Sequence, residues 1–522
     1  MSKFLKGTMI LLAAGLITRI LGFINRIVVA RSIGEEGVGL FMMAFPTLIL
    51  VISIIQLGLP VAISKCVAEA SASNNEKKVK KILVVSLSTT LGLSILFTPI
   101  LAVCAPVLSK YLFTDSRIIY PLLAMVPIIP IVAVSSVLRG YFQGRQNMKP
   151  AAYSQVLEQV VRISLVAFLT VKFLPYGVEY AAAAAMSANV IGELVSLVYL
   201  LAMFKLKKHF RFRRNFFQAV KSGKSTFQEL MEVALPTTGG RLIGSLSWFA
   251  EPIVVAQSLA MAGVASSLAT RQYGELTGYA LPLLMLPSFV TYSLSTSLIP
   301  ALSEANYSGN SRLVEHRLQQ SLRFSFLTGA LSAAILYILA DPLMEALYGT
   351  SHAAVFIKFL APFFIFSYYQ APLQAALQAL NMARAAMYNS LIGAILKTAV
   401  IFIFASQEAF GIMGAAAGIA VGTVLVTMLH YATIMKKINM SIHIRPYFFT
   451  FLILVPVCAA GHWIYYHLLN DTAAAIRLLL AVGVMALLFI ILMFLCRLMS
   501  REETKRIPLF GNMLLALFYR RL

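Results

Sequence analysis

Arg19-Ile-Leu-Gly22 near the N-terminus returns as Arg241-Leu-Ile-Gly244 halfway along the chain. The match continues, because Ile27-Val-Val-Ala-Arg-Ser32 returns as Ile253-Val-Val-Ala-Gln-Ser258. An internal repeat in an apolar chain is typical of transporter folds. An arginine inside an apolar stretch is costly unless it has a partner or a function. The repeat therefore indicates a membrane protein that handles an anion.

The composition is that of a chain that crosses the membrane many times. Of the 522 residues, 59% are hydrophobic and only 12% are charged, whereas a soluble domain is about a quarter charged. The sequence predicts an all-α polytopic membrane protein with fourteen transmembrane helices, because each run is long and does not alternate as in a β-barrel. The runs are 8–30, 38–63, 82–108, 118–139, 151–173, 177–204, 228–257, 273–300, 322–340, 352–380, 387–405, 410–434, 446–468 and 473–497.

The net charge of +23 is explained by where the basic residues fall. With the N-terminus inside, most Lys and Arg lie in segments on the cytoplasmic side, which is the positive-inside pattern. We therefore expect a cell-membrane protein with both termini in the cytoplasm. The basic stretch 205–214 fits topology and contact with anionic lipids better than nucleic acid, and we expect no nucleic-acid partner.

The repeat extends over two six-span halves. At an offset of 235 residues, Leu138, Gln143, Tyr153 and Arg162 correspond to Leu373, Gln378, Tyr388 and Lys397. Six spans per copy give both halves the same orientation, with a cavity between them. The predicted organisation is an N-lobe at 1–204 (spans 1–6), a basic cytoplasmic linker at 205–227, a C-lobe at 228–434 (spans 7–12), and spans 13–14 with a cytoplasmic amphipathic tail at 435–522.

Two arginines of the first span are candidates for binding a phosphate or diphosphate. Arg19 and Arg26 are seven residues apart, so they lie about 20° from each other on one helix face. Paired guanidinium groups without a nearby acid suit a diphosphate, and Arg241 stands at the matching position of the repeat. The alternative is that each arginine bonds a carbonyl or an acid on another helix, or that Arg26 extends to the membrane surface.

Charged residues in other spans are candidates for ion coupling or charge balance. Glu158 and Arg162 are four residues apart, which fits either a salt bridge within one helix or a coupling site. Glu251 shares a helix face with Arg241, and Lys397 is a further charge with no partner nearby in the sequence. We also expect Pro236-Thr-Thr-Gly-Gly240 to loosen the seventh span.

Three glutamines of the tenth span, Gln370, Gln374 and Gln378, follow one helix face. Uncharged amides can bond the hydroxyl groups of a sugar, and they can equally join neighbouring helices. Both interpretations stay open from the sequence alone.

Signals for an enzyme are absent from the sequence. The seven histidines are dispersed, and neither a Gly-x-Ser-x-Gly motif nor a Walker motif occurs, so we expect no catalytic residues and no direct use of ATP. The four cysteines have no metal-ligand spacing, and we expect no metal or other cofactor. An ion gradient such as that of a monovalent cation, the membrane potential, or the concentration gradient of the substrate itself would then drive any transport.

Five segments carry a resemblance to a known family. They are Arg19-Ile-Leu-Gly-Phe-Ile-Asn-Arg-Ile-Val-Val-Ala-Arg31, Gly58-Leu-Pro-Val-Ala-Ile-Ser-Lys65, Leu138-Arg-Gly-Tyr-Phe-Gln-Gly144, Glu251-Pro-Ile-Val-Val-Ala-Gln257 and Tyr273-Gly-Glu-Leu-Thr-Gly278. Together they resemble the polysaccharide-exporter branch of the superfamily that contains the lipid II flippase and the multidrug and toxin extrusion (MATE) antiporters. The resemblance covers essentially the whole chain. It implies two six-helix lobes with two extra helices, and export of a lipid-linked peptidoglycan precursor for the spore cortex.

The resemblance carries over to the first span residue by residue. The lipid II flippase reads Arg-x-Leu-Gly-Phe-x-Arg there, with both arginines in its cavity. Arg19 matches the first arginine, whereas Asn25 stands at the second position and Arg26 follows one place later. The arginines that the family places in the second and eighth spans have no match here, so Arg241 would supply the missing charge.

These observations lead to the hypothesis of a flippase for a lipid-linked oligosaccharide that works by alternating access. Asn25 and the three arginines would bind the diphosphate. Anionic lipids and cell-wall synthesis enzymes are its expected partners. Two alternatives remain: an ion-coupled exporter of small amphipathic cations, and a scaffold for cell-wall enzymes that transports nothing.

Overall fold

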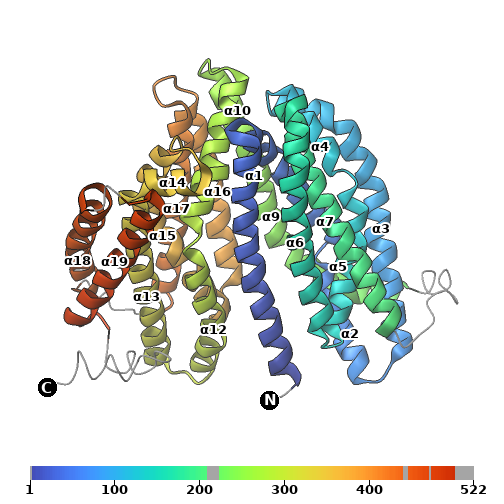
Figure 1. Cartoon of the computed structure of the whole chain (residues 1–522). Coiled ribbons are helices and arrows are strands. Elements are labelled where there is room, and N and C mark those ends of the chain that lie inside the picture. The colour runs from blue at the N-terminus through green and yellow to red at the C-terminus, as the bar shows by residue number, and fades with distance from the viewer. Residues whose placement is uncertain (1–2, 208–222, 439–444, 469–471, 500–522) are drawn as a thin grey trace. The chain divides into compact units, whose positions relative to one another are not determined.

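Helices are the only regular elements in the part of the chain that the computed structural model describes (Figure 1). That part comprises residues 3–207, 223–438, 445–468 and 472–499. The all-α class predicted from the sequence is confirmed. The helices group into two units, the first with residues 1–279 and 401–415 and the second with residues 280–400 and 416–522.

The first unit is organised around one long apolar helix, α1 (Lys3–Gln56), against which α6, α7, α9 and α10 pack. Its other elements are α2 (Leu59–Ala72), α3 (Glu76–Val107), η1 (Leu108–Leu112), η2 (Ser116–Ile118), α4 (Ile119–Met125), α5 (Ile128–Gly144), α6 (Met148–Phe173), η3 (Leu174–Tyr176), α7 (Val178–Lys207), α9 (Lys224–Met261), α10 (Ser266–Gly274) and nearly all of η4 (Glu275–Ala280).

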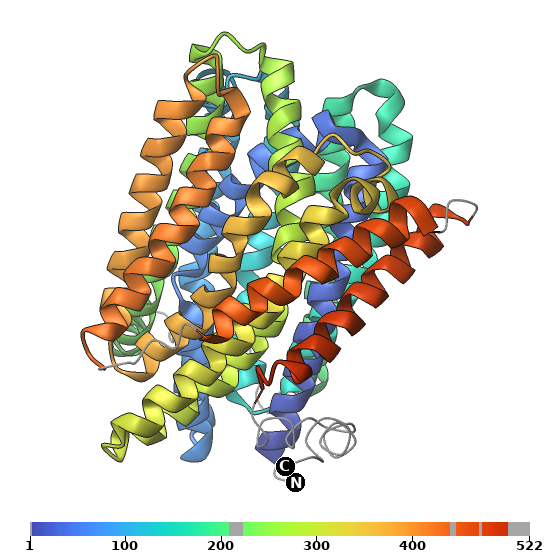
Figure 2. The same ribbon diagram turned by 90° about the vertical axis from the view of Figure 1, so that its left-hand side faces the viewer.

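The second unit has α15 at its centre, packed against α12 and α13. Figure 2 shows its last two helices, α18 and α19, side by side, and contacts between them confirm this. The elements are α11 (Leu281–Met285), α12 (Ser288–Tyr307), α13 (Ser311–Ile338), α14 (Ala340–Tyr348), α15 (Ala354–Ala379), most of α16 (Ala383–Ala405) and α17 (Gly411–Met435), α18 (Arg445–Trp463), η5 (Ile464–Leu468) and α19 (Ala474–Leu495).

Helix α1 is broken at Gly34, where φ is 68° and ψ is −179°. This positive φ favours glycine, because a side chain would be strained there. The apolar stretch Ala13–Ala72 has 60 residues, which as one straight helix would be about 90 Å long, or about three times the apolar core of a bilayer. The break therefore divides the stretch into two consecutive helices.

Eleven helices of the described part are long and apolar enough to cross a membrane. The count becomes twelve when Ser266–Met285 and Ser288–Tyr307, bent by 52°, are taken as one span. This number is lower than the fourteen spans expected from the sequence, for two reasons. The stretch Ala13–Ala72, in which two spans were expected, is counted as one, and α6 is not included. Polar residues at 155, 158, 159 and 162 lower the hydropathy of α6.

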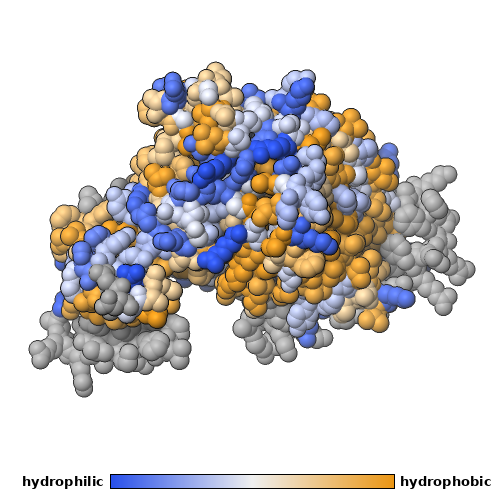
Figure 3. All heavy atoms as spheres, turned by 45° about the horizontal axis from the view of Figure 1, so that its top comes forward, coloured by the Kyte–Doolittle hydropathy of each residue, from blue (hydrophilic) through white to orange (hydrophobic). Residues whose placement is uncertain are grey.

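Broad apolar areas cover the surface seen in Figure 3, as contact with lipid tails requires.

The loosening expected at Pro236 of α9 stays a prediction. The helix continues from Lys224 to Met261 through both Pro236 and Pro252. Each proline lacks the N–H group that a helix residue donates, so one backbone hydrogen bond is missing at each of the two positions. Because α9 packs against α1, α2 and α3, it belongs to the first unit.

The predicted lobe boundaries remain a prediction. They come from a repeat in the sequence, whereas the two units are defined by contacts between residues in the structure, so the units do not test them. Residues 208–222 of the predicted linker lie outside the described residues, as do residues 500–522 of the predicted tail.

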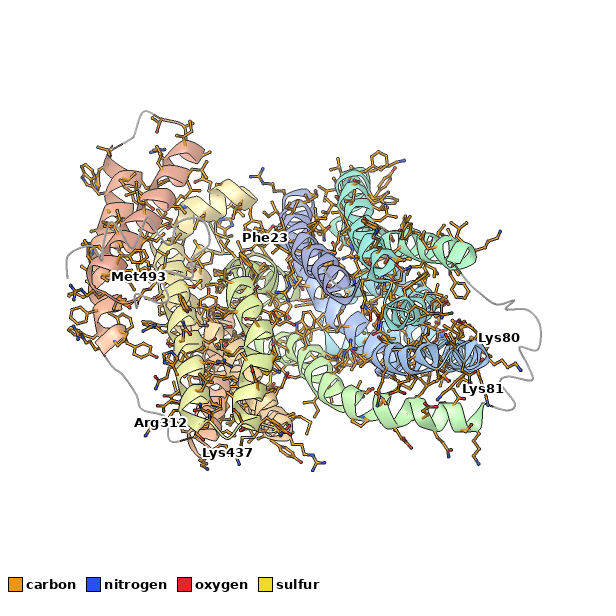
Figure 4. The ribbon with its side chains drawn as sticks, turned by 90° about the horizontal axis from the view of Figure 1, so that it is seen from below. Phe23, Lys80, Lys81, Arg312, Lys437 and Met493 are labelled. Atoms are coloured by element: carbon orange, nitrogen blue, oxygen red, sulfur yellow. The ribbon has the colours of Figure 1, made fainter. Side chains whose placement is uncertain are left out.

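Figure 4 shows Lys80 and Lys81 on α3 of the first unit, viewed from below. The same view shows Arg312 and Lys437 in the second unit. The cytoplasmic location of the termini likewise stays a prediction.

Replacing Gly39 by alanine should destabilise the packing of α1 on α10. A Cβ atom at Gly39 would lie 2.0 Å from the carbonyl oxygen of Thr270, so the two backbones would have to move apart. Gly92 of α3 is the matched control, because a Cβ atom there meets nothing within 4 Å. We expect Gly39→Ala to lower the melting temperature of the detergent-solubilised protein, whereas Gly92→Ala leaves it unchanged or raises it. Equal effects of the two substitutions would contradict the close approach.

Candidate functional site

A network of charged side chains joins α5, α6 and α7 in the interior of the first unit. The Nη2 atom of Arg139 lies 3.0 Å from Glu158 Oε2 and 3.1 Å from both carboxylate oxygens of Glu193. The same atom donates to the Oγ atom of Ser196 at 2.9 Å. Arg162 forms an ion pair with the other oxygen of Glu158. We call Arg139, Glu158, Arg162 and Glu193 the Arg139 network.

The Arg139 network is electrically balanced and largely withdrawn from solvent. The exposed fractions are 19% for Arg139, 13% for Glu158, 17% for Arg162 and 5% for Glu193. Two guanidinium groups face two carboxylates, so no net charge remains among the apolar helices. Removing one partner would leave an uncompensated buried charge, which is strongly unfavourable. The network therefore fixes the packing of three helices.

Half of this network was not anticipated from the sequence. Glu158 and Arg162 form the salt bridge that their spacing allows. Arg139 and Glu193 come from different spans, and the Ser135 hydroxyl also bonds Glu193. Opposite charges in neighbouring apolar spans were the available signal, but the sequence alone does not show which acid meets which base.

The three candidate diphosphate ligands of α1 differ in their environments. Arg19 is exposed and Arg26 is half-buried. Asn25 is only 9% exposed, and its Oδ1 atom has no hydrogen-bond partner. A buried amide oxygen without a partner is unfavourable by about 1–3 kcal/mol, so Asn25 is the residue of the three whose polar side chain calls for an additional ligand or water.

Helix α9 carries two of the candidate residues, Arg241 and Glu251, whose side chains differ in exposure. The Glu251 side chain is buried, with 6% exposure, whereas the Arg241 side chain is exposed. Between them, the Oγ atom of Ser245 lies 2.9 Å from the Oγ atom of Ser53 in α1. This hydrogen bond joins the two helices that carry the repeated arginine motif, so α1 and α9 are neighbours within the first unit.

The candidate residues of the second unit do not gather into one site. The Nε2 atom of Gln370 donates to the carbonyl of Thr423 at 3.2 Å, which joins α15 to α17. Gln374 and Gln378 are exposed. Lys397 lies against Gly422, where a Cβ atom would come within 2.8 Å of the lysine Cβ. Gln370 therefore connects helices, whereas Gln374 and Gln378 are accessible.

A second charged group lies at the end of the first unit away from the N-terminus (Figure 1). Arg117 Nη1 is 2.7 Å from Glu36 and its Nη2 atom is 2.9 Å from Asp115. Arg271 Nη2 is 2.6 Å from Glu35 and its Nε atom is 3.1 Å from Glu275. We call these six residues the far-end cluster. It connects the break in α1 with the segments before α4 and after α9. No pattern in the sequence indicated that these segments meet.

Asp115 has the most protected carboxylate of the far-end cluster, with 4% exposure. Burial by itself would raise its pKa, but hydrogen bonds from Arg117 and Thr270 hold the pKa below its usual value. The Thr270 hydroxyl donates to Asp115 at 2.9 Å. Asp115 is therefore an ionised anchor that joins the segment before α4 to α10.

One group of possible metal ligands lies at the opposite end of the first unit. The ligand atoms of Cys66, Glu69 and Glu229 are within 4.8 Å of one another. The Nζ atom of Lys78 is 2.8 Å from Glu229. Lysine thus already supplies positive charge to this group, and a metal ion is not needed for charge balance.

The fold defines a class of membrane protein that known structures share. A solved structure of the lipid II flippase MurJ in an inward closed conformation matches 93% of this chain and 98% of its own, with a TM-score of 0.68 and 14% identity. An inward-facing multidrug resistance MATE family transporter matches 81% of this chain and 94% of its own, with a TM-score of 0.66 and 16% identity. The chain is therefore a multi-pass membrane protein with this transporter fold.

Sequence comparison places the chain within that class. Residues 4–306 match the family described as polysaccharide biosynthesis protein, and residues 252–403 match the MatE family. Stage V sporulation protein B of Bacillus subtilis (strain 168) is 56% identical over 512 residues, which cover 98% of this chain and 99% of the relative. The lipid II flippase MurJ of the same organism is 26% identical over 76% of each chain. The chain belongs to the polysaccharide biosynthesis protein family.

Replacing Arg139 by methionine should destabilise the protein by about 3–5 kcal/mol, because Glu193 would keep a buried charge without its guanidinium partner. The double variant Arg139→Met/Glu193→Leu should recover much of this loss, since it removes both charges. The measurement is the free energy of unfolding in detergent, followed by intrinsic fluorescence.

The control for this experiment is Lys65→Ala. Lys65 Nζ lies 4.0 Å from Glu69, and the two side chains are 59% and 53% exposed. An exposed pair of this kind contributes at most about 1 kcal/mol. If Arg139→Met were as mild as Lys65→Ala, the Arg139 network would not hold the three helices together.

Replacing Asp115 by asparagine should lower stability at neutral pH and have less effect in acid. The pKa of Asp115 is lowered in the folded protein, so its contribution is complete above the unfolded value of about 4 and declines as pH falls through the folded value. We expect melting temperatures of the wild type and Asp115→Asn to differ at pH 7 and to converge towards pH 3. A difference that grows with acidity would contradict this assignment.

Proposed function

We propose that the protein is a flippase that moves a lipid-linked oligosaccharide across the cell membrane by alternating access. The observation that carries the proposal is the pair of arginines on α1, exposed Arg19 and half-buried Arg26, with the buried side chain of Asn25 next to Arg26 in the chain. A diphosphate that joins a lipid to a sugar would accept hydrogen bonds from both guanidinium groups and from the side-chain NH2 group of Asn25, whereas the Asn25 oxygen would need a separate donor such as water.

The position of Arg241 supports a shared diphosphate site. Arg241 is exposed on α9, and α9 is joined to α1 by the hydrogen bond between Ser53 and Ser245. Guanidinium groups bind phosphate oxygens in a planar, two-pronged geometry that lysine lacks. The lipid would remain in the bilayer while the charged headgroup passes along these residues.

Glu158, Arg162, Glu251 and Lys397 are the proposed residues for coupling or charge balance. Glu158 and Arg162 already belong to the balanced Arg139 network, so a monovalent cation would have to displace an ion pair to bind there. Glu251 is buried on the helix that carries Arg241. We therefore favour the membrane potential as the driving force, with Glu251 as the first residue to test for cation coupling.

The proposed topology has fourteen spans with both termini in the cytoplasm. The break at Gly34 divides Ala13–Ala72 into two spans. Helix α6 has 26 residues, enough to cross the bilayer, and its charged stripe is paired within the Arg139 network. These two additions to the twelve candidates give fourteen. We retain the lobes 1–204 and 228–434 as the halves of the internal repeat.

The proposed substrate is a lipid-linked peptidoglycan precursor for the spore cortex. The relative that is 56% identical is named as a sporulation protein, and another relative is named as a lipid II flippase. Exposed Gln374 and Gln378 are available to bond a sugar, whereas Gln370 already bonds a backbone carbonyl. Anionic lipids would bind the basic cytoplasmic segments, and cell-wall synthesis enzymes would use the exported precursor.

Export of small amphipathic cations is the second candidate function. The match of residues 252–403 to the MatE family favours it. A cation exporter needs unpaired acids, however, and Glu158 and Glu193 both face guanidinium groups. Drug efflux that depends on protons or sodium, without flipping of a lipid-linked substrate, would favour this function over the proposed one.

Replacing Arg19 or Arg241 by alanine should reduce transport of a lipid-linked oligosaccharide in proteoliposomes about tenfold or more, because each loses charged hydrogen bonds to the diphosphate. Spore cortex formation should fall in parallel. Lys172→Ala, at the exposed end of α6, is the matched control for loss of a positive charge. Normal transport and normal cortex in both arginine variants, at normal protein levels, would exclude the proposed site.

A further inference from the structure

Helix α12 of the second unit has a buried face that packs against its neighbours. Thr291, Ser295, Leu298 and Leu302 are buried at spacings of three and four residues, so they lie on one side of the helix. Leu298 and Leu302 join a core cluster with apolar residues of α13 and α15. Figures 1 and 2 show α12 beside α13. Packing thus accounts for one side of α12.

The other side of α12 is exposed, and four of its seven exposed side chains from residue 289 to residue 300 carry a hydroxyl group, while Val290 and Pro300 add apolar surface. Phe289 is 41% and Tyr292 is 51% exposed. Ser293, Thr296 and Ser297 are also exposed. The spacing from 289 to 297 is again that of one helix face. We call Phe289, Tyr292, Ser293, Thr296 and Ser297 the hydroxyl face of α12.

The hydroxyl face differs from the exposed faces of other spans in the same unit. Other spans of the same unit show what a lipid-facing surface looks like in this chain. On α19, Leu479 and Leu487 are 73% and 59% exposed, and on α18, Phe451 and Val455 are 55% and 67% exposed. These surfaces are apolar, as a bilayer favours. The hydroxyl face of α12 therefore points to a watery surface and a polar ligand.

The chemistry of the hydroxyl face is neutral. No Lys, Arg, Asp or Glu occurs from residue 286 to residue 303. The Thr296 hydroxyl donates to the Ser293 carbonyl at 2.7 Å, and the Ser297 hydroxyl donates to the Leu294 carbonyl at 2.8 Å. Each hydroxyl oxygen still has lone pairs that can accept a hydrogen bond. Such a surface suits a ligand rich in uncharged hydroxyl groups.

The aromatic rings narrow the choice of ligand. Phe289 and Tyr292 lie at one end of the hydroxyl face, and an aromatic ring offers a flat apolar surface beside a polar edge. A sugar ring has the same combination of an apolar C–H face and hydroxyl edges. Phosphate would instead be expected beside arginine or lysine. The described surface thus fits the sugar part of a lipid-linked substrate and not its diphosphate.

We propose that the hydroxyl face of α12 binds the sugar part of the transported lipid-linked oligosaccharide and sets specificity for it. The proposal rests on the proposed flippase function and extends it. Gln374 and Gln378 are exposed on α15, which packs against α12, so uncharged side chains are accessible on two neighbouring helices. Recognition of sugar and of diphosphate would then depend on separate residues.

The test compares two substrates in proteoliposomes. One is a polyprenyl diphosphate that carries a disaccharide, and the other is the same polyprenyl diphosphate without sugar. The variant Ser293→Ala/Thr296→Val/Ser297→Ala removes three hydroxyl groups from the exposed face with little change in volume. The matched control is Ser164→Ala/Ser390→Ala, which removes exposed hydroxyl groups from α6 and α16.

The expected result is a selective loss. Each lost neutral hydrogen bond corresponds to about fivefold in binding, so we expect the triple variant to transport the disaccharide-bearing lipid at least about fivefold more slowly. Transport of the sugar-free lipid, and all transport by the control variant, should change by less than about twofold. The single variants Thr296→Val and Ser297→Ala test the same point if the triple variant is not recovered from membranes.

Two other outcomes are distinguishable. Unchanged transport of the disaccharide-bearing lipid by the variants, or an equal loss for both lipids, overturns the role of the hydroxyl face while leaving the flippase function intact. Failure of the wild type to move either lipid argues against the flippase function itself, and with it against this role of α12.

Discussion

The pairing of the Arg139 guanidinium group with two carboxylates is the interaction on which the first unit depends. Arg139 of α5 reaches Glu158 of α6 and Glu193 of α7. In an apolar interior an unpaired charge is far more costly than a paired one, so these three helices have few alternative packings. In the far-end cluster, ion pairs likewise hold together segments that lie where the chain passes from one helix to the next.

Solvent exposure distinguishes the Arg139 network from two of the proposed ligands of the diphosphate. Every charge of the Arg139 network has a partner in the network, and its members are at most 19% exposed. Arg19 and Arg241 are instead exposed on apolar helices. These are the two positions that we propose as contacts for a charged substrate, because an arginine in an apolar span needs a partner or a function. The hydroxyl face of α12 adds a neutral counterpart in the second unit.

The helical class could be predicted because hydropathy over about twenty residues is a local property of the sequence. The salt bridge of Glu158 with Arg162 was accessible for the same reason, since four residues make one helical turn. The partnership of Arg139 with Glu193 was not accessible, because it depends on which sides of α5 and α7 face each other.

The position of α9 has a consequence for how the chain can be divided. In the proposed repeat its sequence belongs to the second copy, yet it packs against α1, α2 and α3 of the first unit. A polypeptide cut between residues 208 and 222 would leave α9 at the start of the second fragment, with its packing partners in the first. Two fragments produced together would therefore share a ready-made interface, so the internal repeat does not make its two copies independent proteins.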